Sequence, residues 1–260
     1  MGLSKYIDAT YLKTPMQAGI SEKETAAIVK KLILDAIAFN FKLVMLRANY
    51  ISLAKEMIKA SNTAVLVGTV IGFHEGISSI QEKLEECQAA INLGVDDLDF
   101  VVNYRAFKEG KLTLVKEEVF KGTTLGLQHH KTVKWIIEVA ALKNNEIAEI
   151  TQLIQKVVVD NFGLEKAKNV YVKSSTGFYS TENNRPNGAT FESIKIMSQN
   201  AGPLKVKAAG GIKSRNDALK MITLGVQRIG TSAAKERIKK LHGNAEDEQG
   251  LDRKHTKQPA

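Results

Sequence analysis

Eight short runs of β-branched and apolar residues, each followed by a longer amphipathic stretch, dominate the pattern of this 260-residue chain. The predicted strands cover 6–9, 42–46, 65–71, 97–102, 133–139, 170–173, 204–208 and 228–230. The predicted helices cover 22–38, 52–60, 79–93, 114–127, 145–160, 190–199, 214–224 and 233–241. Alternation of this kind indicates parallel strands joined by crossover helices. Eight such units without a linker predict a (β/α)8 TIM barrel, an α/β fold whose parallel eight-stranded sheet is closed.

The length of the chain suits one such barrel, because this fold usually takes about 250 residues. Residues 1–242 are therefore predicted to form a single barrel domain. Residues 243–260 contain few apolar and many charged side chains, so we expect them to form a polar, flexible tail.

Composition argues against several classes of function. The net charge is +9, but the basic residues are spread along the chain and aromatic residues make up only 6%. A nucleic-acid interface would concentrate the basic residues, so no nucleic-acid partner is expected, whereas an anionic small molecule suits the charge. No apolar run approaches the roughly 20 residues that span a bilayer, and the first residues lack the apolar stretch of a signal peptide. We expect a cytoplasmic protein without a membrane partner.

Charged residues fall where strand alternation predicts the barrel interior. In the strand at 97–102, Leu98, Phe100 and Val102 form the helix-facing set, so Asp97 and Asp99 face inward. The same alternation groups further charged side chains on one face of their strands: Lys134 with Glu138, then Lys173, then Lys205 with Lys207. Buried charges are costly unless paired, which favours chemistry at the carboxyl ends of the strands. A structural ion-pair network, or a strand phase wrong by one residue, is the alternative that parity leaves open.

Two lysines and one carboxylate are the minimum set for carbon–carbon cleavage through an imine. A free lysine amine has a pKa of about 10.4, so it is protonated at neutral pH and is not a nucleophile. A second cation nearby lowers that pKa. We expect Lys207 to act in this way on Lys173, and Asp99 to move protons directly or through a water.

Two glycine turns follow the last two predicted strands, at 209–214 and 228–233. Glycine lets the backbone approach a ligand closely, and a helix that begins there turns its positive end toward an anion. The loops after the seventh and eighth strands are the usual phosphate site of this barrel. A tight turn alone would explain each glycine, but the pair in this order predicts a phosphorylated substrate.

Four stretches resemble the deoxyribose-phosphate aldolase family, and the resemblance covers about residues 6–240. They are VKSSTGF at 172–178, VKAAGGI at 206–212, DLDFVVN at 97–103 and IDATYLK at 7–13. The turn RIGTS at 228–232 is also similar to the last phosphate-binding turn of the family.

The resemblance implies a class I aldolase that reversibly cleaves 2-deoxy-D-ribose 5-phosphate to acetaldehyde and D-glyceraldehyde 3-phosphate through a lysine Schiff base. It implies Lys173 as the imine-forming residue, Lys207 as the partner that lowers its pKa, and Asp99 as the proton relay. It assigns to the substrate pocket Asp8, Thr10 and Lys134. It assigns to phosphate binding Gly177, Gly210, Gly211, Gly230 and Ser232. It implies no metal and no other cofactor, small phosphorylated sugar and aldehyde substrates, and a homodimer, since the family is often dimeric.

Several positions depart from the family pattern. Ala9 stands where a histidine is common, and Met45 stands where a cysteine is common. Residues 138–142 replace a Glu-Thr-Gly-Glu-Leu-like run, and residues 180–187 lengthen the loop after the predicted Schiff-base strand. Two alternatives therefore stay open, a Schiff-base aldolase of altered aldehyde specificity and an aldolase-like binding protein without turnover.

Overall fold

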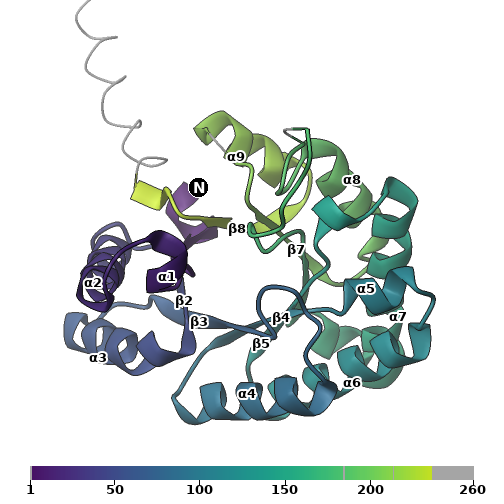
Figure 1. Cartoon of the computed structure of the whole chain (residues 1–260), viewed down its shortest axis with the longest axis horizontal. Helices are drawn as coiled ribbons and strands as arrows, with labels where there is room; N and C mark the ends of the chain where they lie inside the picture. The colour runs from purple at the N-terminus through teal and green to yellow at the C-terminus, as the bar shows by residue number, and fades with distance from the viewer. Residues whose placement is uncertain (1, 184, 213, 236–260) are drawn as a thin grey trace, which may run out of the picture.

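Eight parallel strands pair in chain order in the computed structural model, and the eighth strand closes the sheet onto the first (Figure 1). The structure describes residues 2–183, 185–212 and 214–235. The strands are β1 Ile7–Thr10, β2 Leu43–Leu46, β3 Leu66–Ile71, β4 Asp97–Val101, β5 Thr132–Ile136, β6 Val170–Lys173, β7 Lys205–Ala209 and β8 Val226–Thr231. The predicted (β/α)8 TIM barrel is confirmed.

The helices surround the sheet on the outside, as Figure 1 shows. The longer ones are α2 Glu22–Ala38, α3 Ile51–Ser61, α4 Ile80–Asn92, α6 Leu112–Gln128, α7 Asn144–Ala167, α8 Phe191–Asn200 and α9 Arg215–Thr223. Short helical segments that the sequence analysis did not predict are α1 Pro15–Ala18, α5 Tyr104–Lys108 and the 3-10 turns η1 Leu3–Tyr6, η2 Ala48–Tyr50 and η3 Val139–Ala141. Along the described residues, no helix combines the length and the apolarity needed to cross a membrane.

Side-chain caps define where several helices begin. Ser21 accepts a hydrogen bond from the Glu24 amide, and the Glu24 carboxylate accepts one from the Ser21 amide at 2.8 Å. The same reciprocal pattern begins α4 at Ser79 and α9 at Ser214. Each box satisfies two backbone groups that a helix start would otherwise leave without a partner.

The predicted boundaries differ most from the structure at two places. The fifth strand was expected to reach residue 139, but it ends at Ile136, because Glu138 takes a left-handed conformation (φ 55°) and η3 follows. Helix α7 continues to Ala167, beyond the expected end at residue 160, although Gly163 has non-helical dihedral angles. Most of the helix predicted at 233–241, and the whole tail predicted at 243–260, lie outside the described residues.

The main core lies between the sheet and the helices. Phe100 of β4 stacks on Trp135 of β5, with ring centroids 4.8 Å apart, and the Trp135 indole donates a hydrogen bond to Thr123 of α6. A β-carbon on Gly122 would lie 2.9 Å from the Trp135 ring, so glycine is required where α6 crosses this pair. Phe100 therefore faces the helices as predicted, which leaves Asp99 facing the barrel interior.

Candidate active site

Six charged side chains from five strands form a closed ring of ion pairs inside the barrel. We call it the interior ring; in order around the circuit, its members are Asp99, Lys134, Asp97, Arg228, Asp8 and Lys207. Starting from Asp99, the successive N···O distances are 2.7, 2.8, 3.0, 2.6, 2.6 and 2.9 Å. No member is more than 4% exposed, and the three carboxylates balance the three cations. The ring is therefore electrically neutral by itself.

Lys173 lies next to the ring and adds one more cation to it. Its Nζ is 2.8 Å from Asp99 Oδ2, the same oxygen that Lys207 contacts at 2.9 Å. Burial and the Lys207 cation, opposed by Asp99, together lower the pKa of Lys173 to about 8. Lys173 is thus the side chain whose proton can leave without unbalancing the ring, and a neutral amine is a nucleophile.

Two features of the strands bring these two lysines together. Lys173 is the last residue of β6 and is paired in register with Lys207 of β7. Just beyond it, the Ser174 hydroxyl donates to the Ala209 carbonyl at 3.2 Å and accepts from the Ala209 amide at 3.0 Å. These bonds join the carboxyl ends of β6 and β7, so the two ammonium groups are held on one carboxylate.

Asp99 is the centre of the charge arrangement. Burial alone would raise its pKa, but Lys134, Lys173 and Lys207 together hold that pKa well below its usual range. These three cations therefore favour the ionised form of Asp99. The carboxylate holds three ammonium groups in place around the point where Lys173 meets the cavity.

A cavity of about 670 Å³ opens at the carboxyl ends of the strands, and Lys173 lines it. Six of the predicted site residues line its wall: Thr10, Gly177, Gly210, Gly211, Gly230 and Ser232. The other predicted site residues belong to the interior ring: Asp8, Asp99, Lys134 and Lys207. The glycine turns and Lys173 therefore line the same cavity. The ring members are not among the described residues that line it, and Asp99 of the ring contacts it through Lys173.

The glycine turn after β7 packs closely against the loop that precedes α8. Gly211 has a φ of 73°, and a β-carbon there would lie 2.7 Å from the Ala189 carbonyl oxygen. A β-carbon on Gly188 would lie 2.5 Å from the Gly210 backbone. Larger residues would push these two loops apart, so the glycines keep a backbone surface at the cavity wall.

The capped start of α9 modifies the expected phosphate site. The Ser214 side chain accepts a hydrogen bond from the Asp217 amide at 3.0 Å, and Asp217 accepts one from the Ser214 amide at 2.8 Å. The carboxylate in the first turn also offsets the positive end of the helix. The glycine turns are therefore better placed than α9 to receive an anion.

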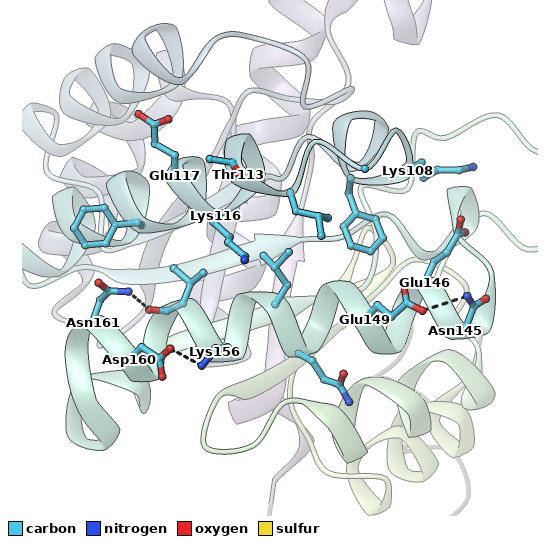
Figure 2. A pocket seen from close by; sticks show the side chains of 17 residues that line it. Lys108, Thr113, Lys116, Glu117, Asn145, Glu146, Glu149, Lys156, Asp160 and Asn161 are labelled. Carbon is cyan, nitrogen blue, oxygen red and sulfur yellow. Dashed lines mark hydrogen bonds and ion pairs between the residues drawn. The ribbon is translucent and has the colours of Figure 1, made fainter.

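A wider groove of about 1040 Å³ lies on the outer layer, between α6 and α7 (Figure 2). The charged side chains that line it are largely exposed, and Lys156 pairs with Asp160 one turn along the same helix at 2.8 Å. Figure 2 shows Glu149 directed toward Asn145, again a neighbour on α7. The groove lies among helices, so it shares no residue with the interior ring or the glycine turns.

The sequence analysis assigned no site role to Arg228 or Glu138. Arg228 was considered only as the start of a glycine turn, yet it completes the interior ring through Asp8 and Asp97. Glu138 is buried beyond the end of β5 and accepts hydrogen bonds from the Thr176 amide at 3.0 Å and from the Thr176 hydroxyl. The shared parity of Lys134 and Glu138 was the available signal for Glu138.

Lys205 has the parity of Lys207 but a different position. It begins β7, is partly exposed, and lies over the Tyr171 ring at 5.5 Å. Within the described part of the chain, no group of three or more histidine, cysteine, aspartate or glutamate side chains is placed to bind a metal ion.

Comparison with known proteins identifies the family. A deoxyribose-phosphate aldolase from Staphylococcus saprophyticus is 35% identical over 247 residues, which cover 95% of this chain and 100% of the relative. The chain belongs to the deoxyribose-phosphate aldolase family. A second member, from Metamycoplasma hominis, is 37% identical over 226 residues, covering 86% of this chain and 90% of the relative. No family model matches the chain.

Solved structures agree with this aldolase fold. An aldolase named QR15 superimposes with a TM-score of 0.77 at 28% identity, covering 96% of this chain and 99% of the other. The tetrameric deoxyribose phosphate aldolase of Aeropyrum pernix superimposes with a TM-score of 0.73 at 24% identity, covering 93% of this chain and 92% of the other. At that lower identity, the second likeness shows the fold alone.

Proposed function

We propose that this aldolase reversibly cleaves 2-deoxy-D-ribose 5-phosphate to acetaldehyde and D-glyceraldehyde 3-phosphate, through a Schiff base on Lys173. One observation supports this above all others: the Lys173 amine lines the cavity and shares one carboxylate oxygen with Lys207. The names of the curated relatives support the choice of sugar.

The first step is attack of the neutral Lys173 amine on the C1 aldehyde of the open-chain sugar. With a pKa of about 8, roughly one amine in ten is neutral at pH 7, against about one in three thousand for an unperturbed lysine. The carbinolamine that forms takes up a proton and loses water, which leaves a protonated imine. Asp99, which touches Lys173, is proposed to relay protons in this step.

The protonated imine then accepts electrons from the bond that breaks. The C2–C3 electron pair moves to form an enamine on Lys173, while the C3 hydroxyl loses its proton and becomes the aldehyde of glyceraldehyde 3-phosphate. Protonation of the enamine carbon and hydrolysis release acetaldehyde and restore the amine. No electron acceptor besides the imine is needed, in keeping with the expectation that the reaction uses no other cofactor.

The substrate phosphate is proposed to lie against one part of the cavity wall. The glycine turns and Ser232 line that wall. Thr10 also lines the cavity, and its hydroxyl donates to the Asp8 carbonyl at 2.9 Å. Asp8 and Lys134 are proposed to act from the ring, by holding Lys207 and Asp99.

Trapping with borohydride tests the proposal. The protein is incubated with deoxyribose 5-phosphate and borohydride, and the adduct is located by mass spectrometry. We expect an adduct on Lys173 together with release of acetaldehyde when borohydride is left out. Absence of an adduct on Lys173 would refute the Schiff-base assignment. An adduct without acetaldehyde release would instead favour altered specificity or a binding protein without turnover.

The homodimer and the cytoplasmic location stay predictions. Light scattering of the purified protein measures the oligomeric state, and a mass equal to two chains is the expected result. A mass equal to one chain would contradict the homodimer without affecting the reaction.

A further inference from the structure

Glu138 is a buried carboxyl group that the interior ring does not use. It is 1% exposed, and its Oε1 is buried without a hydrogen-bond partner among the described residues. Its other oxygen, Oε2, accepts hydrogen bonds from the amide and the hydroxyl of Thr176. No ion pair in the described part of the chain includes Glu138, although the Lys173 charge acts on it. Lys173 and Glu138 are thus buried ionisable groups outside the ring, whose own charges balance.

Thr176 stands between two cavities. It lines the cavity that contains Lys173, and it also lines a smaller cavity of about 230 Å³ together with Glu138. The smaller cavity is large enough for water, and the exposed Arg105 on its wall marks its way to the solvent. Glu138 therefore contacts the reaction cavity through one hydroxyl group and the solvent through the other cavity.

The Thr176 hydroxyl has the connections of a proton relay. Its oxygen accepts a hydrogen bond from the Phe178 amide at 3.0 Å, and its hydrogen is donated to Glu138. A hydroxyl hydrogen rotates to suit its partners, so a protonated Glu138 can donate to Thr176 while Thr176 turns its own hydrogen toward the cavity. Both hydrogen-bond directions are thus available without movement of the backbone.

We propose that Glu138, acting through the Thr176 hydroxyl, supplies the proton that the enamine carbon takes up when acetaldehyde forms on Lys173, and removes it in the reverse direction. The inference rests on the proposed Schiff-base function. In the cleavage direction, the Thr176 hydroxyl gives its proton to the enamine CH₂ carbon and receives the Glu138 proton. The enamine becomes the protonated imine of acetaldehyde, and Glu138 becomes a carboxylate. Water in the smaller cavity then returns a proton to Glu138.

Asp99 is less suited to this step. Its three lysine partners keep Asp99 ionised, so it has no proton to give to carbon. Burial raises the pKa of Glu138, whereas its bonds to Thr176 and the Lys173 charge oppose that shift. A carboxyl group with a raised pKa changes its protonation state more readily near neutral pH, as a general acid and base must. The neighbouring groups on other elements are His74, Glu75, Tyr104, Arg105 and Tyr179.

Hydrogen exchange in acetaldehyde tests the relay separately from imine formation. Acetaldehyde is incubated with the full-length protein in D₂O, and loss of the methyl proton signal is followed by NMR. In parallel, borohydride trapping with acetaldehyde measures imine formation on Lys173. In Glu138→Gln, the amide oxygen can still accept both bonds from Thr176, but the group no longer carries an exchangeable acid proton. We expect trapping within about twofold of the wild-type chain and exchange slower by roughly 100-fold or more.

Changes at Thr176 provide the second arm of the test. Thr176→Val keeps the shape without the hydroxyl and should slow exchange as Glu138→Gln does, whereas Thr176→Ser should retain most of the exchange. Glu149→Gln, on the outer face of α7 (Figure 2), is the matched control and should change neither readout. Wild-type exchange in Glu138→Gln, or loss of trapping in both Glu138→Gln and Thr176→Val, would overturn the relay. Failure of the wild-type chain to be trapped on Lys173 would instead refute the proposed function.

Discussion

Two buried groups of charges lie on opposite sides of the barrel wall, and they differ in whether the buried lysine meets a cavity. Lys83 of α4 pairs with Glu118 of α6 in the helix layer, and its ammonium also donates to the Gly76 and Val101 carbonyls at 2.6 and 2.8 Å. All three hydrogens of that ammonium therefore have acceptors. Lys173 has one charged partner, which it shares with Lys207, and it lines a cavity.

The direction of the pKa shift does not separate these two lysines. Burial lowers the pKa of both Lys83 and Lys173. What differs is the surroundings of the amine, because Lys173 lines a cavity, whereas Glu118 and two backbone carbonyls enclose the Lys83 ammonium. A shifted pKa therefore points to a functional group more strongly where the side chain also lies in a cleft.

The largest expected effect on activity comes from replacing Lys173, the lysine that lines the cavity. Lys173→Met should lower aldol cleavage by roughly 10⁴-fold or more, because it removes the nucleophile. The same change should stabilise the fold at neutral pH, because it removes an extra buried cation while Asp99 keeps Lys134 and Lys207. Steady-state kinetics and urea unfolding at pH 7 measure the two effects.

The pH dependence of wild-type stability provides the control. Well below pH 8, Lys173 is protonated in both the folded and the unfolded chain, so the cost of burying its charge is fully present. Between the folded pKa of about 8 and the ordinary value near 10.5, the unfolded chain binds more protons than the folded one. The free energy of unfolding should therefore gain up to about 3 kcal/mol from this group as pH rises through that window. An equal gain in Lys173→Met would contradict this account.

Replacing Lys83, the lysine paired with Glu118, should lower stability and leave activity unchanged. Lys83→Met should lower the free energy of unfolding by about 3–5 kcal/mol, because it leaves the Glu118 carboxylate buried without its partner. The protein that remains folded should keep its activity. Urea unfolding and activity per folded molecule check both points. Replacing both partners, as in Lys83→Met with Glu118→Leu, should recover part of the loss; a further loss would show that the pair itself stabilises the fold.

The effect of Lys207 on the pKa of Lys173 should be visible in the pH–rate profile. Lys207→Leu removes the nearby cation, so the pKa of Lys173 should rise above about 8 and the rate profile should move to higher pH. At pH 7, the fraction of neutral amine falls about tenfold for each pH unit by which this pKa rises. Activity should be partly recovered at alkaline pH. An unchanged profile would contradict the role of Lys207.

The smallest effect is expected at Cys87, which lies in α4 like Lys83. The thiol is buried, and burial raises its pKa to about 12, so the reactive thiolate is scarce at ordinary pH. Treatment of the folded protein with iodoacetamide at pH 8 should leave activity unchanged, with Cys87 unmodified by mass spectrometry. Rapid alkylation would show that α4 separates from its neighbours often enough to expose Cys87, in spite of the buried Lys83–Glu118 pair.

Strand alternation was sufficient to predict which charged side chains face the barrel interior. It was not sufficient to predict that Arg228 completes the interior ring. Asp99 and Lys173 alternate with apolar residues along their strands. Since successive side chains of a strand point to opposite faces, their inward direction could be predicted. The pairing of Lys207 with Arg228 depends on a register shift between β7 and β8 at Val206, which no local pattern encodes. Glu138 was obscured because its left-handed backbone ends the strand earlier than its β-branched neighbours indicate.

The Lys83–Glu118 pair was unpredictable for a related reason. The two residues lie 35 positions apart on different helices, and each sits within an otherwise ordinary charged sequence. Which face of a helix is buried can be estimated from its own period, but which partner it meets depends on how neighbouring helices pack. The short segments α1 and α5 lacked the length that makes a helical period recognisable.

The interior ring has a consequence for how the chain acquires activity as it folds. Asp8 lies in the first strand and Arg228 in the last, 220 positions apart, and the bond between them forms part of the ring. During synthesis, the Lys173 and Asp99 side chains are made well before Arg228, so the ring can close only after the eighth strand docks onto the first. A nascent or truncated barrel without β8 would contain Lys173 and Asp99 but not the complete interior ring. Catalysis would then begin only when the barrel is complete.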